Sequence, residues 1–405
     1  MGKAGKKDVL LITNYYHFEE EKKSSRYRTL AEMISARDDL TLEVVTSTFY
    51  HQTKKQRNTS ELLRDLPFRV TFCREEGYSR NISLQRLKSC RTFGKSVLNY
   101  LKQRERPDVI YQVVPSLDVA DEVSAYAKRH HIPLIIDVQD LWPEAFRMAL
   151  DIPVMSDILF APMMWKANRI YSRADHIVAV SDTYVRRAAA VNRQCSSALS
   201  VYIGTDIDYA YALMNCHPVG KPKDEFWLTY VGALGHSYDI PAVIKAIALL
   251  KQRGISNVVF HVLGDGVLKE TFCKEAQKQG VDTRFHGFVE YGEMMAMLAA
   301  SDAAVNPIVG KSVSSIINKV SDYAVAGVPV INTQNSAEYR ALLEEYQCGI
   351  NCENGNIEAL AAGILRLYED DALRAVMREN SARLGREKFS RRETYRRIVE
   401  LIAEA

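Results

Sequence analysis

The chain has 405 residues, of which 47% are hydrophobic and 25% are charged, and its net charge is +3. This composition is typical of a soluble globular protein, and the length favours two domains. No apolar run reaches the roughly 18 to 20 residues of a membrane span, and the first residues lack the features of a signal peptide. Seven scattered cysteines without zinc-ribbon spacing indicate reduced thiols in a cytoplasmic protein and no metal site.

The charge is shared unevenly between the two halves of the chain. Residues 1–204 hold 31 Lys and Arg against 24 Asp and Glu, or +7, while the remainder holds 22 against 26, or −4. A basic half joined to a mildly acidic half indicates that the first half faces an anionic partner. Aromatic and basic residues are not interleaved as on a nucleic-acid-binding surface, so we expect no nucleic-acid partner.

Short apolar runs alternate with helical stretches through the first half. These runs lack polar alternation, which is typical of strands buried on both faces of a parallel sheet. They predict strands at Val9–Thr13, Leu42–Ser47, Arg69–Cys73, Val109–Val114, Leu134–Asp137, Ile177–Val180 and Leu199–Ile203. Between them, residues 86–106 predict a basic amphipathic helix. It either lies on an anionic membrane surface or covers the sheet with a solvated charged face, and both interpretations stay open.

The second half repeats this pattern after a turn-rich junction near 204–226. The predicted strands are Trp227–Val231, Val258–Leu263, Thr283–Phe285, Ala303–Asn306, Val328–Asn332 and Gly349–Cys352. Helix-length spacers between strands imply right-handed βαβ units, so the fold class is α/β with two Rossmann-like, doubly wound parallel sheets. We expect domains at 1–204 and 205–388, facing a cleft, and a helix at 389–405 that packs back on the first domain.

Ligands of open α/β sheets bind at the carboxyl ends of the strands, and anions bind at helix N-termini. The loops after the first three strands of the second half are therefore candidate binding loops. Their glycines let backbone amides approach a phosphate, although each loop alone is also typical of a tight turn. The candidate residues are Gly232, Ala233, Leu234, Gly235, Gly264, Asp265, Gly287, Phe288 and Val289.

The fourth loop of the second half leads into a predicted helix at Val313–Ala326. Ser312, Ser314 and Ser315 are its N-cap candidates. Lys319 and Asp322 are three positions apart and so project from one face of that helix. A cation and a carboxylate there suit a pyrophosphate and ribose hydroxyls, and the alternative is a solvated surface ion pair.

The order of these motifs resembles the family-4 glycosyltransferases of the GT-B fold. The residues that carry the resemblance are the three glycine loops and the run Asn318–Val330 (Asn-Lys-Val-Ser-Asp-Tyr-Ala-Val-Ala-Gly-Val-Pro-Val). In the first half, Asp140–Glu144 (Asp-Leu-Trp-Pro-Glu) resembles the branch that builds bacterial capsule or O-antigen chains. The resemblance implies a retaining enzyme that uses a nucleotide-diphosphate sugar, by default a UDP-sugar, without metal or other cofactor.

The resemblance also implies roles for particular residues near the donor. Asp322 should hold the ribose, and Lys319 should neutralise the leaving diphosphate, which is capped by backbone at Ser314, Ser315, Ile316 and Ile317. Ser314 stands where the family has a glutamate, and Gln139 where it has a histidine. Beside Gln139, Asp140 either orients the acceptor or caps a helix at Leu141–Leu150. Asp206 and Asp208 resemble a metal-binding acidic pair, but they fall in a structural slot of the family.

The basic first half suits a lipid-diphosphate-linked or oligosaccharide acceptor at the inner face of the cell membrane, where the enzyme would be peripheral. Ser24, Ser25, Arg26 and Arg28 follow the first strand and are our acceptor-phosphate candidates. Two other functions stay open: a GT-B-fold sugar-nucleotide epimerase or hydrolase, and a non-catalytic partner subunit. A Rossmann dehydrogenase is disfavoured because neither domain's first strand is followed by Gly-x-Gly-x-x-Gly.

Overall fold

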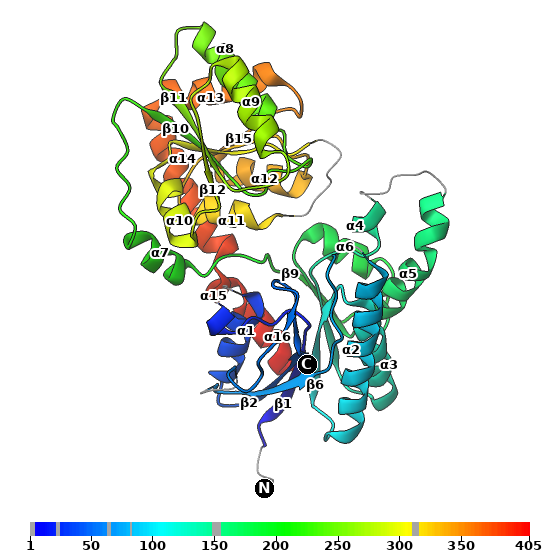
Figure 1. Cartoon of the computed structure of the whole chain (residues 1–405). Coiled ribbons are helices and arrows are strands. Elements are labelled where there is room, and N and C mark those ends of the chain that lie inside the picture. Colours follow the sequence, from blue (N-terminus) through cyan, green and yellow to red (C-terminus); the bar gives the residue numbers. More distant parts are fainter. Residues whose placement is uncertain (1–4, 22–24, 63–65, 82, 148–154, 310–315) are drawn as a thin grey trace. The chain divides into compact units, whose positions relative to one another are not determined.

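Two units make up the computed structural model, which describes residues 5–21, 25–62, 66–81, 83–147, 155–309 and 316–405 (Figure 1). The first unit comprises Met1–Tyr202 and Thr394–Ala405, and the second comprises Ile203–Glu393. The chain therefore leaves the first unit, forms the whole of the second and returns. Each unit contains one parallel sheet with helices on both faces, which confirms the predicted fold class.

Seven parallel strands form the sheet of the first unit, and each predicted strand position is occupied. The strands are β1 (Lys7–Ile12), β2 (Leu40–Ser47), β5 (Arg69–Cys73), β6 (Val109–Val114), β7 (Leu134–Val138), β8 (His176–Ala179) and β9 (Ser197–Ser200). Their order across the sheet is β5-β2-β1-β6-β7-β8-β9, so the winding reverses between β1 and β6. A short antiparallel hairpin, β3 (Phe49–Tyr50) and β4 (Lys55–Gln56), follows β2 and was not predicted.

The helices of the first unit cover the two faces of its sheet. They are α1 (Arg26–Ser35), α2 (Leu84–Gln103), α3 (Leu117–His130), α4 (Glu144–Arg147), α5 (Met155–Tyr171), α6 (Asp182–Ala189) and α16 (Arg396–Glu404), with a 3₁₀ turn at Glu19–Glu21. Leu10 of β1 packs in the core with α2, α3 and α5, whereas its neighbour Leu11 packs in the core with α1 and α16. Because successive residues enter different cores, the strands read as unbroken apolar runs.

The helix predicted at 86–106 is α2, and its apolar face belongs to the protein core. Phe93, Val97 and Leu101 are fully buried, and α2 packs against α3. The structure therefore supports the interpretation as a surface helix, with basic residues such as Lys88 and Arg91 pointing outward. Among the residues that are described, no helix is long and apolar enough to cross a membrane.

The last helix, α16, completes the first unit. Tyr395, Ile398 and Ile402 are fully buried in the core that contains α1. Figure 1 shows red α16 beside blue α1, and these two helices are in contact. Near the start of the chain, the Lys7 ammonium donates a hydrogen bond to the Ala403 carbonyl oxygen (2.6 Å), which ties β1 to the end of α16.

Six parallel strands form the sheet of the second unit, again at the predicted positions. They are β10 (Phe226–Val231), β11 (Val258–Leu263), β12 (Thr283–Gly287), β13 (Ala303–Asn306), β14 (Val330–Asn332) and β15 (Gly349–Asn351). Their order is β12-β11-β10-β13-β14-β15, so the winding reverses between β10 and β13. In such sheets the ligand crevice lies at the carboxyl ends of the two strands where the winding reverses.

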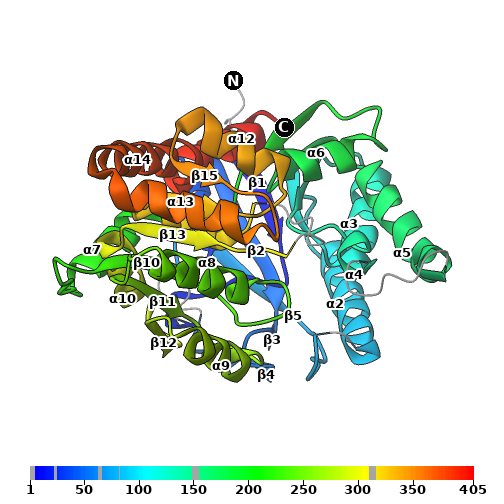
Figure 2. The ribbon, with the colours of Figure 1, turned by 90° about the horizontal axis from the view of Figure 1, so that it is seen from above.

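The helices of the second unit are α7 (Ile207–Asn215), α8 (Ile240–Gln252), α9 (Lys269–Gln279), α10 (Tyr291–Ala300), α11 (Asn318–Val325), α12 (Ala337–Tyr346), α13 (Ile357–Glu369), α14 (Asp371–Leu384) and α15 (Arg391–Thr394), with a π-helical turn at Gly385–Phe389. Figure 2 shows α8 and α13 side by side over this sheet, where Val243 and Ile364 share one core with β10.

The helix that follows β13 is α11. It begins at Asn318 and not at Val313, so the predicted start was wrong.

Candidate functional site

Three of the predicted binding loops meet around one pocket in the second unit, at the carboxyl ends of β10, β11 and β12. The pocket has a volume of about 350 Å³ and is lined by Val231, Gly232, Ala233, Leu263, Gly264, Asp265, Phe288, Val289 and Met294. Nearly all of these are predicted residues or their immediate neighbours. Phe288 is 89% exposed, so its ring is available to a ligand.

The glycines of these loops are required where two loops touch. Gly264 has φ +152°, and a Cβ atom built on it would lie 1.8 Å from the Gly232 carbonyl oxygen. No side chain fits there, so the tight-turn interpretation holds at Gly264. At Gly235, by contrast, a built Cβ atom has no described neighbour within 4 Å. Among the described residues, none fills the space beside Gly235.

Two of the predicted loop residues have other roles. The Leu234 side chain is fully buried in the core, and its backbone amide donates to the Asp265 carbonyl oxygen (2.9 Å). Leu234 thus joins the loops and does not line the pocket. The Asp265 carboxylate accepts a hydrogen bond from the Gly266 amide (2.8 Å) and lies 3.8 Å from the Lys269 ammonium.

Lys319 lies on the first turn of α11, and its side chain is directed at the loop after β10. Its Nζ atom is 2.6 Å from the position that a Cβ atom on Gly232 would occupy. The ammonium lies over the rings of Tyr230 and Tyr238, 4.2 and 3.8 Å from their centroids. Only 9% of Lys319 is exposed, and Nζ has no hydrogen-bond partner within the described ranges. Burial lowers the pKa of this ammonium well below its ordinary value.

Asp322, one turn further along α11, has its own partners. Its Oδ1 atom accepts hydrogen bonds from Thr205 Oγ1 (3.0 Å) and from the Tyr291 hydroxyl (2.9 Å). Burial raises the pKa of Asp322 to about 6. Lys319 and Asp322 do not form a solvated ion pair, because the ammonium is buried beside Gly232 and the carboxylate is bonded elsewhere. That alternative is therefore wrong.

The start of α11 is capped by backbone and not by a serine. Ile317 occupies the N-cap position in an extended conformation, and its side chain makes no capping hydrogen bond. Ile316 is buried, and Ile317 is partly buried. The other predicted residues of this loop, Ser312, Ser314 and Ser315, lie outside the described residues.

In the first unit, Arg26 has a structural role, and its predicted contact with the acceptor stays a prediction. Its Nε atom lies 3.0 Å from Asp137 Oδ2, and both side chains are almost completely buried. Its NH1 atom donates to the carbonyl oxygens of Val201 (3.0 Å) and Tyr202 (3.1 Å). Its NH2 atom donates to Asp137 Oδ1 (3.3 Å), so four of the five N–H donors of the guanidinium are used by the fold.

Gln139 extends this buried group of side chains. Its Nε2 atom donates a hydrogen bond to Asp137 Oδ1 (2.8 Å), so the amide is oriented by the same carboxylate that holds Arg26.

The other predicted acceptor residues lie at or before the start of α1. Ser25 is buried at the N-cap of α1, Arg28 lies 3.7 Å from Glu32 along that helix, and Ser24 lies outside the described residues.

Asp140 lies at the carboxyl end of β7 but does not cap a helix. The helix α4 begins only at Glu144, and the Asp140 carboxylate instead accepts hydrogen bonds from Trp142 Nε1 (3.2 Å) and the Tyr184 hydroxyl (3.5 Å). Burial raises its pKa. The capping interpretation was therefore wrong, and Asp140 is a partly desolvated carboxylate at the edge of the sheet where ligands bind.

The acidic pair in the junction agrees with its structural interpretation. Asp206 caps α7 by accepting a hydrogen bond from the Tyr209 amide (3.2 Å), and Asp208 lies 3.5 Å from Arg392. Within the described part of the chain, no three His, Cys, Asp or Glu side chains gather as a candidate metal site. Independence from metal stays a prediction.

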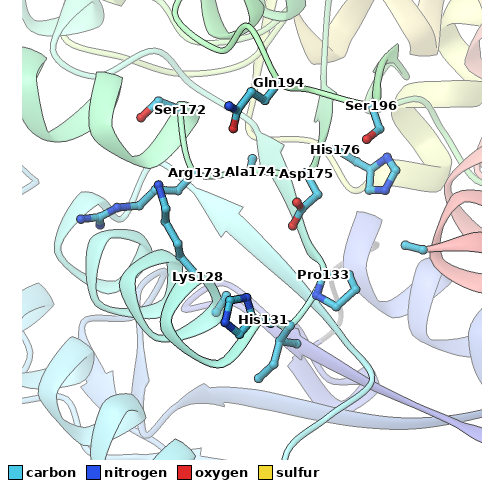
Figure 3. Close-up of a pocket in the computed structure, with 13 residues that line it drawn as sticks. Lys128, His131, Pro133, Ser172, Arg173, Ala174, Asp175, His176, Gln194 and Ser196 are labelled. Carbon is cyan, nitrogen blue, oxygen red and sulfur yellow. The ribbon is translucent and has the colours of Figure 1, made fainter.

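Figure 3 shows another pocket of the first unit, of about 440 Å³, which contains none of the predicted residues. It lies at the amino ends of the strands, because Pro133 precedes β7 and Ser196 precedes β9. Its acid, Asp175, is used by the fold: the carboxylate accepts a hydrogen bond from the Leu134 amide (2.8 Å). This edge is opposite the one where open α/β sheets bind ligands, so we assign it no part in the site.

Sequence reasoning missed the partners of the two central residues. Thr205 and Tyr291, which donate to Asp322, lie in the junction and at the start of α10. Tyr230 and Tyr238, which flank Lys319, are the last but one residue of β10 and the residue before the cap of α8. The aromatic residues on either side of the first binding loop were the feature of the sequence that could have indicated the contacts of Lys319.

Comparison with known proteins finds two families along the chain. The family described as "Glycosyl transferase 4-like domain" matches residues 27–195, and the one described as "Glycosyl transferases group 1" matches residues 217–384. A glycogen synthase of Mycobacterium tuberculosis is 28% identical over 215 residues. That alignment covers 51% of this chain and 50% of the relative, so the chain spans about half the length of the curated relative that it matches.

Solved structures share the fold over nearly the whole chain. Anabaena Alr3699/HepE, solved with UDP, has a TM-score of 0.65 at 16% identity, covering 98% of this chain and 100% of that one. A sucrose-phosphate synthase from Thermosynechococcus elongatus has a TM-score of 0.69 at 14% identity, with 98% and 99% covered. WaaG, a glycosyltransferase involved in lipopolysaccharide biosynthesis, has a TM-score of 0.63 at 14% identity, with 98% and 100% covered.

Proposed function

Since the chain belongs to the family-4 glycosyltransferases of the GT-B fold, we propose that it transfers a sugar from a UDP-sugar to a lipid-linked or saccharide acceptor with retention of configuration. The observation that carries the proposal is the buried ammonium of Lys319 beside Gly232. A buried cation without a hydrogen-bonding partner is costly unless a bound anion compensates for it. The diphosphate of a nucleotide sugar is an anion of that kind.

Breaking the bond between the sugar and the phosphate leaves negative charge on the diphosphate. Lys319 is suited to stabilise that charge, and the pocket walls exclude part of the water that would screen it. The space beside Gly235, which none of the described residues fills, gives backbone amides access to the phosphate oxygens. In this mechanism the leaving phosphate accepts the proton of the acceptor hydroxyl, and no metal ion is needed.

Asp322 is proposed to hold the ribose of the donor. Its Oδ1 atom already accepts two hydrogen bonds from the protein, which orient the carboxylate and leave Oδ2 for the ribose hydroxyls. Phe288, whose ring is exposed, and Val289 line the pocket at the carboxyl ends of β10, β11 and β12 and are proposed to contact the base. The uridine assignment draws support from the Anabaena protein, whose structures contain UDP and UDP-glucose.

In the first unit, Asp140 is the proposed catalytic carboxylate. Its Trp142 and Tyr184 partners orient it, and it would either position the acceptor hydroxyl or balance positive charge at the anomeric carbon. Gln139 has a neutral side chain bound to Asp137, so its proposed role is limited to a hydrogen bond with the donor sugar through the amide oxygen.

The proposal extends to the synthesis of a bacterial surface polysaccharide at the inner face of the cell membrane. Apolar side chains are exposed on two helices of the first unit: Leu84 (83%) at the start of α2, and Ile158 (72%) and Trp165 (73%) along α5. Both helices pack against α3. The nearby basic residues Lys88 and Arg91 are also exposed, which suits an anionic lipid surface.

Incubation of the full chain with UDP-sugars, with and without a lipid-diphosphate-linked sugar, tests the function. Transfer predicts that free UDP and an extended acceptor appear together and only when acceptor is present. A changed or hydrolysed sugar nucleotide without acceptor would identify the epimerase or hydrolase alternative. The Asp140→Asn variant should lose at least about a hundredfold in kcat while its affinity for UDP stays unchanged. Full activity of that variant would exclude Asp140 from catalysis.

A further inference from the structure

Two cations of the first unit, Lys54 and Arg86, are held by the same neighbours. The Lys54 ammonium donates to Asn81 Oδ1 (2.6 Å), and Arg86 NH1 donates to the Asn81 carbonyl oxygen (2.8 Å). Both charges lie over the Tyr78 ring, 4.9 and 5.4 Å from its centroid. Arg86 also lies over the Trp142 ring, at 4.7 Å. Residues far apart in the sequence thus form one cluster, which we call the Lys54–Arg86 cluster.

The cluster lies at the edge of the sheet where ligands of open α/β folds bind. Lys54 is in the turn between β3 and β4, after β2, and Tyr78 and Asn81 follow β5. Trp142 follows β7, and Arg86 is on the first turn of α2. A further member comes from the loop after β1, because Arg86 NH2 donates to the Tyr15 hydroxyl (3.1 Å).

No carboxylate neutralises either cation within the ranges that the structure describes. Neighbouring cations do have acidic partners: Arg57 lies 2.9 Å from Glu21, and Lys88 lies 3.1 Å from Glu76. Lys54 and Arg86 have no such ion pair, and the buried Nε atom of Arg86 has no described hydrogen-bond partner. Burial and the charge of Arg86 both lower the pKa of Lys54.

The nearest acids are engaged elsewhere. Glu75 is buried and accepts hydrogen bonds from Ser89 (2.8 Å) and Asn14 (3.4 Å). Asp140 accepts from Trp142 and Tyr184. The charges of these acids act on the cluster from a distance, but neither acid forms an ion pair with it. Two partly buried cations that repel each other therefore lack the anion that such a group requires.

We propose that Lys54 and Arg86 bind the diphosphate group of the acceptor. This inference rests on the proposed function, which supplies a phosphate-bearing acceptor to this unit. The guanidinium of Arg86 supplies a fixed positive charge with a donor at Nε that the described protein leaves unused, and Lys54 adds a point charge. The cluster takes the role that the sequence assigned to Arg26 and Arg28, and the exposed Leu84 beside it suits the first part of a lipid chain.

The test is calorimetric titration of the full chain with farnesyl diphosphate and with inorganic pyrophosphate, in the presence of saturating UDP to fill the donor site. Lys54→Asn suits the backbone, because Lys54 has φ +58° and asparagine tolerates that conformation. Arg86→Met keeps the length of the side chain without its charge. Lys55→Ala and Lys102→Ala are matched controls that remove exposed lysines outside the cluster.

We expect each cluster variant to weaken farnesyl diphosphate binding by about tenfold or more, and the controls to leave it unchanged. If farnesyl diphosphate binds more tightly than pyrophosphate, the site recognises a lipid-linked diphosphate. If the two bind equally, the site recognises the diphosphate group alone. Wild-type affinity in Lys54→Asn overturns the inference, even if Arg86→Met fails to fold. UDP affinity is measured in parallel in every variant. If the wild-type protein does not bind UDP, the proposed donor is refuted. Farnesyl diphosphate is then titrated in the absence of UDP, and that titration still tests the Lys54–Arg86 cluster.

Discussion

The Nζ atom of Lys319 lies 3.8 Å from the centre of the Tyr238 ring, in a position where burial lowers the pKa of the ammonium. The aromatic ring stabilises the charge only in part, because a cation–π contact is worth roughly 0.5 to 2 kcal/mol. A bound diphosphate would add the opposite charge that is missing. This relationship leads to the first prediction.

Lys319→Met should reduce the affinity for UDP by about tenfold or more, since it removes a charge-assisted contact with the diphosphate. The thermal stability of the unliganded protein should stay the same or rise, because the variant no longer buries a charge. Calorimetry and thermal unfolding measure the two effects. Lys274→Met, on the exposed face of α9, is the control. Unchanged UDP affinity would remove Lys319 from the site.

The affinity for a UDP-sugar should rise with pH around the pKa of Asp322, which is about 6. The ionised carboxylate accepts ribose hydrogen bonds more strongly than the protonated one. A UDP-sugar is the right probe, because its diphosphate has no proton that titrates near neutral pH. The Asp322→Asn variant should bind more weakly and show no such midpoint. A midpoint retained in that variant would assign the titration to another group.

Folding stability should depend on the same carboxyl group with the opposite sign. The pKa is about 6 in the folded protein and near 3.8 for an unperturbed aspartate. Between these values the unfolded chain has released its proton and the folded protein has not, so stability falls as the pH rises and stays lower above about 6. Urea unfolding across this range should show less of this fall in Asp322→Asn.

Gly264→Ala and Gly235→Ala separate the two reasons for a glycine in the binding loops. Alanine at Gly264 would clash with the Gly232 carbonyl oxygen, so we expect a loss of about 2 kcal/mol or more in unfolding free energy. Alanine at Gly235 meets no described atom, so stability should be preserved and only UDP affinity should fall. If Gly235→Ala binds UDP normally, the phosphate does not lie beside Gly235.

Arg26→Met should destabilise the protein by about 3 to 5 kcal/mol, because it leaves the buried carboxylate of Asp137 without its partner. Arg28→Met, two residues along the same helix, removes a partly exposed charge that lies 3.7 Å from Glu32. Its effect should stay below about 0.5 kcal/mol. Denaturant unfolding compares the two variants. Similar small losses for both would contradict the structural role of Arg26.

Membrane association should depend on the exposed apolar side chains of α5. We expect the double variant Ile158→Ser, Trp165→Ser to sediment with vesicles containing anionic lipid at least about tenfold less than the wild-type protein. Val267→Ser, which removes an equally exposed apolar side chain from the second unit, is the control. If the double variant binds the vesicles as well as the wild type does, α5 is not the contact surface.

The sheets could be predicted from the sequence because parallel strands buried on both faces leave a strong local signal. All the parallel strands were found in this way, whereas the two-residue strands of the β3–β4 hairpin are too short to leave one. The start of α11 was missed for a related reason. Several serines offered N-cap signals before it, but the helix begins after Ile317, whose side chain provides none.

The site was predictable where backbone forms it and unpredictable where distant side chains meet. The glycine loops follow strands, so their convergence follows from the topology. The structural contact of Arg26 was missed because its partner, Asp137, is 111 positions away, and local sequence does not show that the pair is buried. The same holds for Thr205, 117 positions from Asp322, and for the Lys54–Arg86 cluster, which four separate loops and the first turn of α2 bring together.

The return of the chain to its first unit has a genetic consequence. Ile398 and Ile402 fill part of the core that contains β1, so a stop codon before α16 would expose that core of the first unit and leave the residues of the second unit complete. During synthesis, the first unit cannot complete this core until α16 has been translated. Mutations that truncate the chain before α16 should therefore act as folding defects of the first unit, and a separately supplied α16 peptide is the suppressor to test.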